Sequence, residues 1–250
     1  ATERAISLAK LAGAPLYVVH VTTEGAIEAI RRAQLEGFPI FGETCTHYLT
    51  LTTDNLAKPG FEGAKYVCSP ALRGQEDLDA LWDAINQGVL NAISSDHCGF
   101  NYSVHKQQGK DDFTMIPNGA PGMQDRMQVV WTYGVATGKI SRQKYVEVCC
   151  TNPAKNNGIY PQKGSLSIGA DADIMIFDPD YEGVFSVKDS LQGVDYNAYE
   201  GMKQSGRVEK VFLRGNLVAD CGKYTGIAGT GKFVQAKPFA QAYQSANNNK

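Results

Sequence analysis

Short apolar runs that alternate with amphipathic helices constrain the fold of this chain more than any other feature. Residues 16–21 read LYVVHV, an almost continuous apolar run that is typical of a strand buried on both faces of a parallel sheet. Thr22 or Thr23 can cap a following helix, which Gly37 ends. Residues 38–44 then read as a second strand. This strand–helix–strand unit is the building block of a parallel sheet.

The same alternation continues to about residue 160. A short extended segment is expected at 65–69, a helix at 76–87, and a short buried strand that leads into Asp96. The loop at 99–122 is rich in Gly, Asn, Asp and Pro, and loops of this length inside a compact domain are usually functional. Further helices are expected at 123–136, 141–150 and from 152 to about 158, and at the very start of the chain, where Gly13 ends a helix. The pattern predicts an α/β fold.

From residue 163 the pattern changes to short strands and turns. Strands are expected at 173–177, 208–213 and 217–219, with a hairpin turn at Gly215–Asn216. We therefore predict an α/β part at 1–160, a β-rich part at 161–235 and a C-terminal arm at 236–250 with a disordered tip.

Two polar side chains stand at strand ends. His20 comes near the end of the first apolar run, and Asp96 follows the short buried strand around Ala92–Ile93. The carboxyl ends of parallel strands meet at one edge of a sheet or barrel, where active sites form. An imidazole and a carboxylate are suitable zinc ligands. Two plainer interpretations stay open: Asp96 caps a turn, and His20 is a buried structural histidine.

Composition narrows the class of function. The chain has 250 residues, 43% of them hydrophobic, and a net charge of -2, so neither nucleic acid nor an anionic membrane is an expected partner. Its six cysteines contain no C-x-x-C pair, which favours free thiols in a reducing cytoplasm over structural zinc. The other histidines, His47, His97 and His105, have no ligand spacing and are expected to be structural or exposed.

Eight motifs occur in order along nearly the whole chain: PLYVVHVTT (15–23), GETCTHYL (42–49), GAKYVCSPALR (63–73), SSDHCGF (94–100), GKDDFTMIPNGAPG (109–122), TNPAK (151–155), GADADIMIFDP (169–179) and NAYEGM (197–202). Together they resemble the C-terminal half of dihydropyrimidinases and D-hydantoinases, in the amidohydrolase superfamily, and the SSDHCGF wording is most similar to bacterial members.

The resemblance implies a fold and a set of residue roles. The fold would be the C-terminal part of a TIM (β/α)8 barrel plus a small β-sandwich-like portion. The resemblance makes His20 and Asp96 ligands of two zinc ions, with manganese or cobalt as alternatives. It also makes Asp96 the general base and acid, while main-chain groups of Ser69 and Asn118 hold the substrate. The substrate would be a small cyclic ureide, a dihydropyrimidine or hydantoin opened to an N-carbamoyl amino acid, and the assembly a cytoplasmic homotetramer.

The sequence also departs from this family pattern. It contains no H-x-H pair, and the family's carboxylated lysine and a further histidine ligand would lie on earlier strands. A whole barrel takes about 250 residues, so we expect this chain to hold only the later strands and to be inactive alone. Thr46–His47 stand where many relatives have Pro–Gln.

Two alternatives to an enzyme remain. One is a non-catalytic scaffold of the same fold, similar to the collapsin-response mediator proteins, in which the positions of His20 and Asp96 are not metal ligands. The other is a stand-alone interaction module, whose open barrel edge would expose strands and apolar surface. Both His20 and Asp96 are present, which favours the enzyme.

Overall fold

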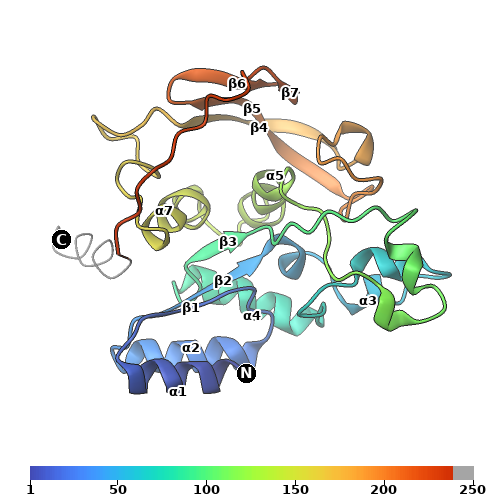
Figure 1. The fold of residues 1–250 in the computed structure, drawn as a ribbon, viewed down its shortest axis with the longest axis horizontal. Coiled ribbons are helices and arrows are strands. Elements are labelled where there is room, and N and C mark those ends of the chain that lie inside the picture. Colours follow the sequence, from blue (N-terminus) through green and yellow to red (C-terminus); the bar gives the residue numbers. More distant parts are fainter. Residues whose placement is uncertain (239–250) are drawn as a thin grey trace.

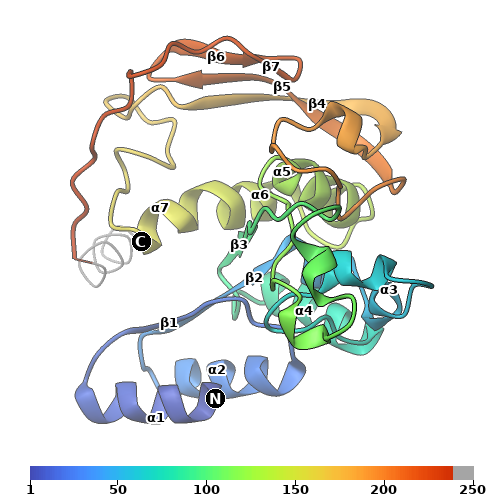
Figure 2. The same cartoon turned by 45° about the vertical axis from the view of Figure 1, so that its right-hand side comes forward.

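The chain folds into four successive layers in the computed structural model, which describes residues 1–238 (Figure 1). Helices α1 (Thr2–Ala12) and α2 (Glu24–Leu35) form one outer layer, and a sheet of β1, β2 and β3 lies on them. Helices α5, α6 and α7 come next, and a second sheet of β4 to β7 covers the opposite side (Figure 2). No helix among the described residues is long and apolar enough to cross a membrane.

The first sheet is parallel, as predicted. Strands β1 (Leu16–Val18), β2 (Ile40–Cys45) and β3 (Ala92–Ser94) pair in that order, with Leu16 opposite Ile40 and Cys45 opposite Ser94. The connection from β1 to β2 runs through α2. The connection from β2 to β3 runs through η1 (Thr46–Leu49), α3 (Thr53–Leu56), η2 (Glu62–Tyr66) and α4 (Gln75–Asn86). All three strands therefore point their carboxyl ends the same way.

Close packing joins this sheet to α2. A side chain at Gly42 in β2 would meet Ile30 Cδ1 at 3.0 Å and Leu90 Cδ2 at 2.9 Å, so the absence of a Cβ lets helix and strand approach. Helix α4 buries the face predicted for it, with Leu81 and Ile85 inaccessible to solvent.

Helices α5 (Arg126–Val130), α6 (Arg142–Val146) and α7 (Asn152–Asn156) lie between the two sheets. Two π-helical turns, η5 (Trp131–Val135) and η6 (Glu147–Thr151), continue α5 and α6. The Trp131 ring stacks against Phe177 of the second sheet at 4.7 Å between centroids, and this contact ties that sheet to the helices.

The second sheet is antiparallel and contains β4 (Ile174–Val184), β5 (Lys203–Leu213), β6 (Asn216–Asp220) and β7 (Lys223–Tyr224), in chain order. A 3-10 turn, η7 (Val187–Asp189), follows β4. The hairpin loop between β5 and β6 is Arg214–Gly215, with φ of 48° and 79°, so the predicted Gly215–Asn216 turn was displaced by one residue. Both central residues have positive φ, which suits the twist of a two-residue hairpin.

Two other expectations were wrong in detail. The first strand ends at Val18 rather than Val21, and η2 occupies part of the segment expected to be extended at 65–69. The long loop 99–122 contains two short 3-10 turns, η3 (Lys106–Gly109) and η4 (Phe113–Met115). The division into parts at 160 and 235 stays a prediction, and the tip of the predicted arm lies outside the described residues.

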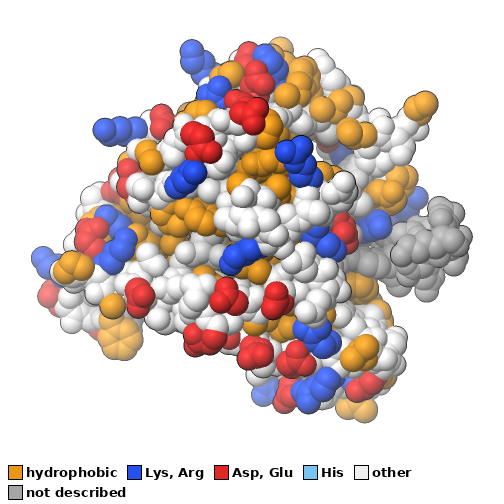
Figure 3. All heavy atoms as spheres, turned by 180° about the vertical axis from the view of Figure 1, so that it is seen from behind, with side chains coloured by type: hydrophobic (Ala, Val, Ile, Leu, Met, Phe, Trp, Pro, Cys, Tyr) orange, Lys and Arg blue, Asp and Glu red, His pale blue; other side chains and the backbone are white. Residues whose placement is uncertain are grey.

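The face of the molecule opposite to that in Figure 1 carries no large patch of only positive or only negative charge (Figure 3). Acidic and basic side chains are interspersed there, and apolar side chains gather between them in the middle of the face (Figure 3).

Candidate metal centre

The carboxyl ends of the three parallel strands bring potential ligands to one edge of the sheet. His20 follows β1, Cys45 ends β2, His47 lies in η1, and Asp96 follows β3. Ligand atoms of Cys45, His47 and Asp96 all lie within 4.8 Å of one another. His20 is near enough for its charge to act on His47. His20 and Asp96 thus follow β1 and β3 at the same edge of the sheet, as the sequence predicts.

The backbone at His20 and Asp96 is unusual. Each has a φ of 42°, and only four non-glycine residues among 1–238 have positive φ. Such a conformation costs on the order of 1–3 kcal/mol and persists where the surrounding structure imposes it, often at functional sites. The turn after each strand carries its side chain onto the same edge of the sheet.

The structural roles considered for these two residues are not observed. Within residues 1–238, the Asp96 carboxylate caps no turn and the His20 imidazole forms no hydrogen bond. Both side chains are partly accessible. They are therefore available to a ligand.

His47 is a residue of the cluster that sequence analysis expected to be merely structural or exposed. Its side chain is 4% exposed, and its Nε2 atom has no hydrogen-bond partner among the described residues. Burial, followed by the nearby charge of His20, lowers the pKa of His47 to about 4. The imidazole is then neutral at pH 7, which is the form that binds metal. A buried nitrogen without a partner costs about 1–3 kcal/mol, and a cation would relieve that cost.

Unlike the His47 Nε2 atom, the Cys45 thiol has a hydrogen-bond partner among the described residues. Its Sγ lies 3.2 Å from Ser94 Oγ, and the Ser94 hydroxyl donates to Glu43 Oε1 at 2.9 Å. Since a serine hydroxyl has one proton, the Cys45 thiol must be the donor to Ser94. Burial raises the pKa of this thiol well above its ordinary value. The neutral imidazole and the carboxylate are therefore ready ligands, whereas Cys45 must first lose a proton.

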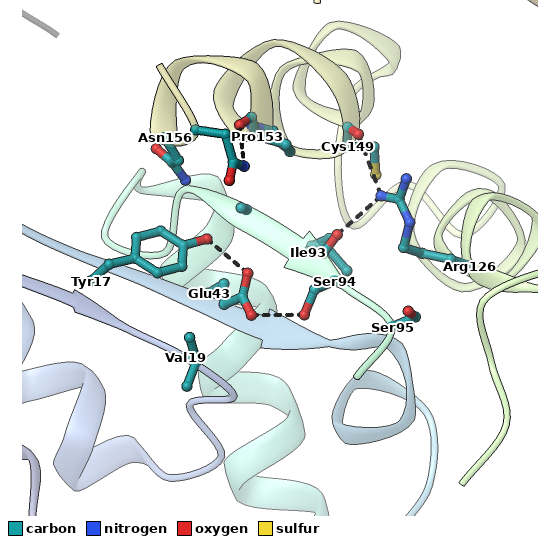
Figure 4. A pocket seen from close by; sticks show the side chains of 12 residues that line it. Tyr17, Val19, Glu43, Ile93, Ser94, Ser95, Arg126, Cys149, Pro153 and Asn156 are labelled. Atoms are coloured by element: carbon teal, nitrogen blue, oxygen red, sulfur yellow. Dashed lines mark hydrogen bonds between the residues drawn. The ribbon is translucent and has the colours of Figure 1, made fainter. Parts of the chain in front are cut away.

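A cavity of about 510 Å³ lies beside this cluster, between the first sheet and the helices above it. Figure 4 shows Tyr17, Glu43 and Ser94 on the sheet side, with Arg126 and Asn156 opposite them. Tyr17 donates its hydroxyl proton to Glu43 Oε2 at 2.7 Å. His20, His47 and Asp96 do not line this cavity, and its link to the cluster is the hydrogen-bond chain from Glu43 through Ser94 to Cys45.

The structure places Ser69 and Asn118 at exposed positions of two neighbouring segments. The Gly119 N–H donates to the Val67 carbonyl at 2.9 Å, which joins the two segments. The Cys98 N–H donates to Ala120 O at 3.1 Å, so the Asn118 segment also adjoins the chain after Asp96. Ser69 and Asn118 thus lie on a rim beside the ligand cluster.

A buried hydrogen bond connects this site to the distant end of the chain. The Tyr199 hydroxyl donates to Thr46 Oγ1 at 2.8 Å, and both side chains are buried. Thr46 directly precedes His47, so the segment before β5 supports the turn that carries the imidazole.

The other two histidines fit the roles expected for them. His97 Nδ1 accepts from the Gly122 N–H at 3.3 Å, and His105 Nδ1 accepts from the Asn101 N–H at 2.9 Å. Both fasten the loop 99–122.

Comparison with known proteins decides the family. The model of the amidohydrolase family matches residues 10–218. The chain belongs to the amidohydrolase family. Its amidohydrolase relatives include a D-hydantoinase from Streptomyces coelicolor, 49% identical over 94% of this chain and 50% of the relative. A D-hydantoinase from Ralstonia pickettii is 45% identical over 96% of this chain and 52% of the relative.

Solved structures agree with the family assignment. The crystal structure of a dihydropyrimidinase from Brevibacillus agri superposes with a TM-score of 0.94, at 46% identity, over 96% of this chain and 52% of that one. The resemblance to dihydropyrimidinases and D-hydantoinases, and the partial-barrel fold it implied, are therefore confirmed. The chain spans about half the length of the relatives it matches.

Proposed function

We propose that the protein carrying this chain hydrolyses the cyclic amide bond of dihydropyrimidines or hydantoins to give N-carbamoyl amino acids. The observation that carries this proposal is the cluster of Cys45, His47 and Asp96 at the carboxyl ends of neighbouring parallel strands. His20 follows β1 at the same edge, and its charge acts on His47. The family is metal-dependent, and the D-hydantoinase relatives point to the cyclic amide.

The donor set suits a divalent metal, for which we propose zinc, with manganese or cobalt as alternatives. His20 and Asp96 would hold it, and the unpartnered Nε2 of His47 makes this residue an added candidate ligand. The metal would polarise the amide carbonyl and activate water. The H-x-H pair and the carboxylated lysine that the resemblance implies have no counterpart in the described ligand cluster.

Asp96 would do the proton transfer. Its carboxylate would accept the proton of the attacking water and return it to the ring nitrogen as the carbon–nitrogen bond breaks. Main-chain groups at Ser69 and Asn118 on the rim would bind the carbonyl and N–H groups of the ureide ring. Exposure of both residues supports this role, because a substrate can reach them.

Cellular setting and assembly are also part of the proposal. All six cysteines are free, which suits a reducing cytoplasm. A homotetramer is proposed from the family resemblance.

The experiment compares Asp96→Asn with Asp111→Asn, an exposed carboxylate in the loop 99–122, in the metal-loaded protein. We expect Asp96→Asn to reduce kcat for dihydrouracil or hydantoin by about 10²–10⁴-fold, the range for losing a general acid–base group. Asp111→Asn should keep full activity. Full activity in Asp96→Asn would refute the role of Asp96, and a wild-type protein that binds metal without hydrolysing either ring would favour the scaffold alternative.

A further inference from the structure

A fully buried lysine stands in the long loop beside the proposed substrate rim. Lys106 begins η3 and has no exposed side-chain surface, although several neighbours in the loop 99–122 are exposed. Burying an ammonium group is costly unless its donors are all satisfied. The partners of this side chain therefore indicate its role.

The Lys106 ammonium meets three backbone carbonyls. Its Nζ lies 3.0 Å from Val67 O, 2.5 Å from Pro117 O and 2.7 Å from Gly119 O. An ammonium has three protons to donate, so the three acceptors match its donors in number. The Phe100 ring lies 5.7 Å from Nζ and covers it further.

These carbonyls belong to the two segments of the rim. Val67 is two residues before Ser69, while Pro117 and Gly119 flank Asn118 on either side. One direct hydrogen bond, from Gly119 N–H to Val67 O, also joins the segments. The ammonium adds a charge-assisted link to each segment, and such bonds are about twice as strong as neutral ones.

We propose that Lys106 is a positioning residue that fixes the Ser69 segment against the Asn118 segment and so builds the substrate-binding rim. The link between the two segments is inferred from the hydrogen-bond distances of the Lys106 ammonium alone. Its consequence for substrate rests on the proposed function, through the roles of Ser69 and Asn118.

The surroundings of the ammonium agree with this role. Burial lowers the pKa of Lys106 to about 8, and the groups that act on its charge are Cys68 and Cys98. Its hydrogen-bond acceptors are carbonyls rather than carboxylates. The Lys106 ammonium is therefore fully hydrogen-bonded only while both segments stay in place, and its hydrogen bonds in turn hold the two segments together.

The first test uses the 250-residue chain and needs no activity. Lys106→Met removes all three donors, and Lys110→Met, at an exposed lysine four residues on, is the matched control. Local opening of the rim should raise amide exchange at Gly119 at least tenfold in Lys106→Met. The Val21 amide, which donates to Glu43 O of β2 at 2.8 Å, should exchange as in wild type in both variants.

Unchanged exchange at Gly119 in a folded Lys106→Met variant would overturn the proposal. If that variant does not fold, Lys106→Gln replaces it, because a neutral amide with two donors is a milder change. Exchange at Gly119 should still rise about threefold in Lys106→Gln, and an unchanged rate there would overturn the proposal equally.

The second test separates positioning from general stability. In metal-loaded protein that hydrolyses dihydrouracil, Lys106→Met should raise KM at least tenfold and lower kcat less than threefold, because the ligand cluster is untouched. Lys110→Met should change neither constant. A large fall in kcat with unchanged KM would contradict a role at the rim. If wild type hydrolyses nothing, the proposed function fails while the exchange result still decides the link between the segments.

Discussion

His47 shows how one buried side chain can govern the response of the site to pH. Its imidazole has a pKa of about 4 in the folded protein and the ordinary value of 6.5 in the unfolded chain. The unfolded chain therefore takes up a proton first as the pH falls. Stability that is fully present above pH 6.5 is lost between pH 6.5 and 4.

This residue yields a prediction for the metal-free chain. Between pH 7 and 4, His47 should account for a loss of about 3 kcal/mol in the free energy of unfolding, since one pKa unit corresponds to about 1.4 kcal/mol. His47→Gln should remove this part of the pH dependence. Urea unfolding of both proteins at a series of pH values measures it, and parallel pH curves would contradict the assignment.

Sequence analysis singled out His20 and Asp96 at this edge of the sheet but neither Cys45 nor His47, and for His47 the reason is physical. His20 and Asp96 each follow an apolar strand, and that position alone indicates the edge of a parallel sheet. His47 lies within a 3-10 turn, two residues after β2, where no periodicity marks it. Its role became visible only when Cys45 and Asp96 from neighbouring strands stood beside it.

At the scale of elements, the helix after His20 depends on its cap. Thr23 is the N-cap of α2, and its Oγ1 accepts from the Ala26 N–H at 3.3 Å. Thr23→Ala should lower the free energy of unfolding by about 1 kcal/mol, because a helix N–H loses its partner. Thr23→Ser keeps the hydroxyl and should stay near wild type. Chemical denaturation compares the two, and equal stability would show that the cap contributes nothing.

Helices were easier to predict than strands in this chain. Helices α1 and α4 lie within a residue or two of their expected bounds because Gly13 and the apolar faces mark them. Strand β1 was overestimated because the apolar run continues through Val19 to Val21, although the strand ends at Val18 and the backbone turns at His20. Side-chain character alone does not report that turn.

At the scale of the molecule, the ligand cluster is smaller than the dinuclear site implied by the family resemblance. His20, Cys45, His47 and Asp96 supply at most part of such a site. We expect the 250-residue chain to bind fewer than two zinc ions, and weakly, in equilibrium dialysis with metal analysis. Stoichiometric binding of two zinc ions per chain would contradict this expectation.

The overall arrangement could be predicted only in part. Parallel strands joined by helices, followed by antiparallel strands, were readable from the change of pattern near residue 163. The layering, with α5 to α7 between the two sheets, was not, because contacts such as Trp131 with Phe177 join residues far apart in the sequence. Short-range patterns carry no information on such pairs.

The hydrogen bond from Tyr199 to Thr46 has a consequence for the order in which the molecule is made. The two residues are 153 positions apart, so the turn that carries His47 lacks this support until Tyr199 has left the ribosome. At about 5–20 residues per second, translation of the intervening stretch takes on the order of ten seconds or more. A nascent chain can therefore pair its parallel strands before Tyr199 is made, and the turn that carries His47 gains this support only afterwards.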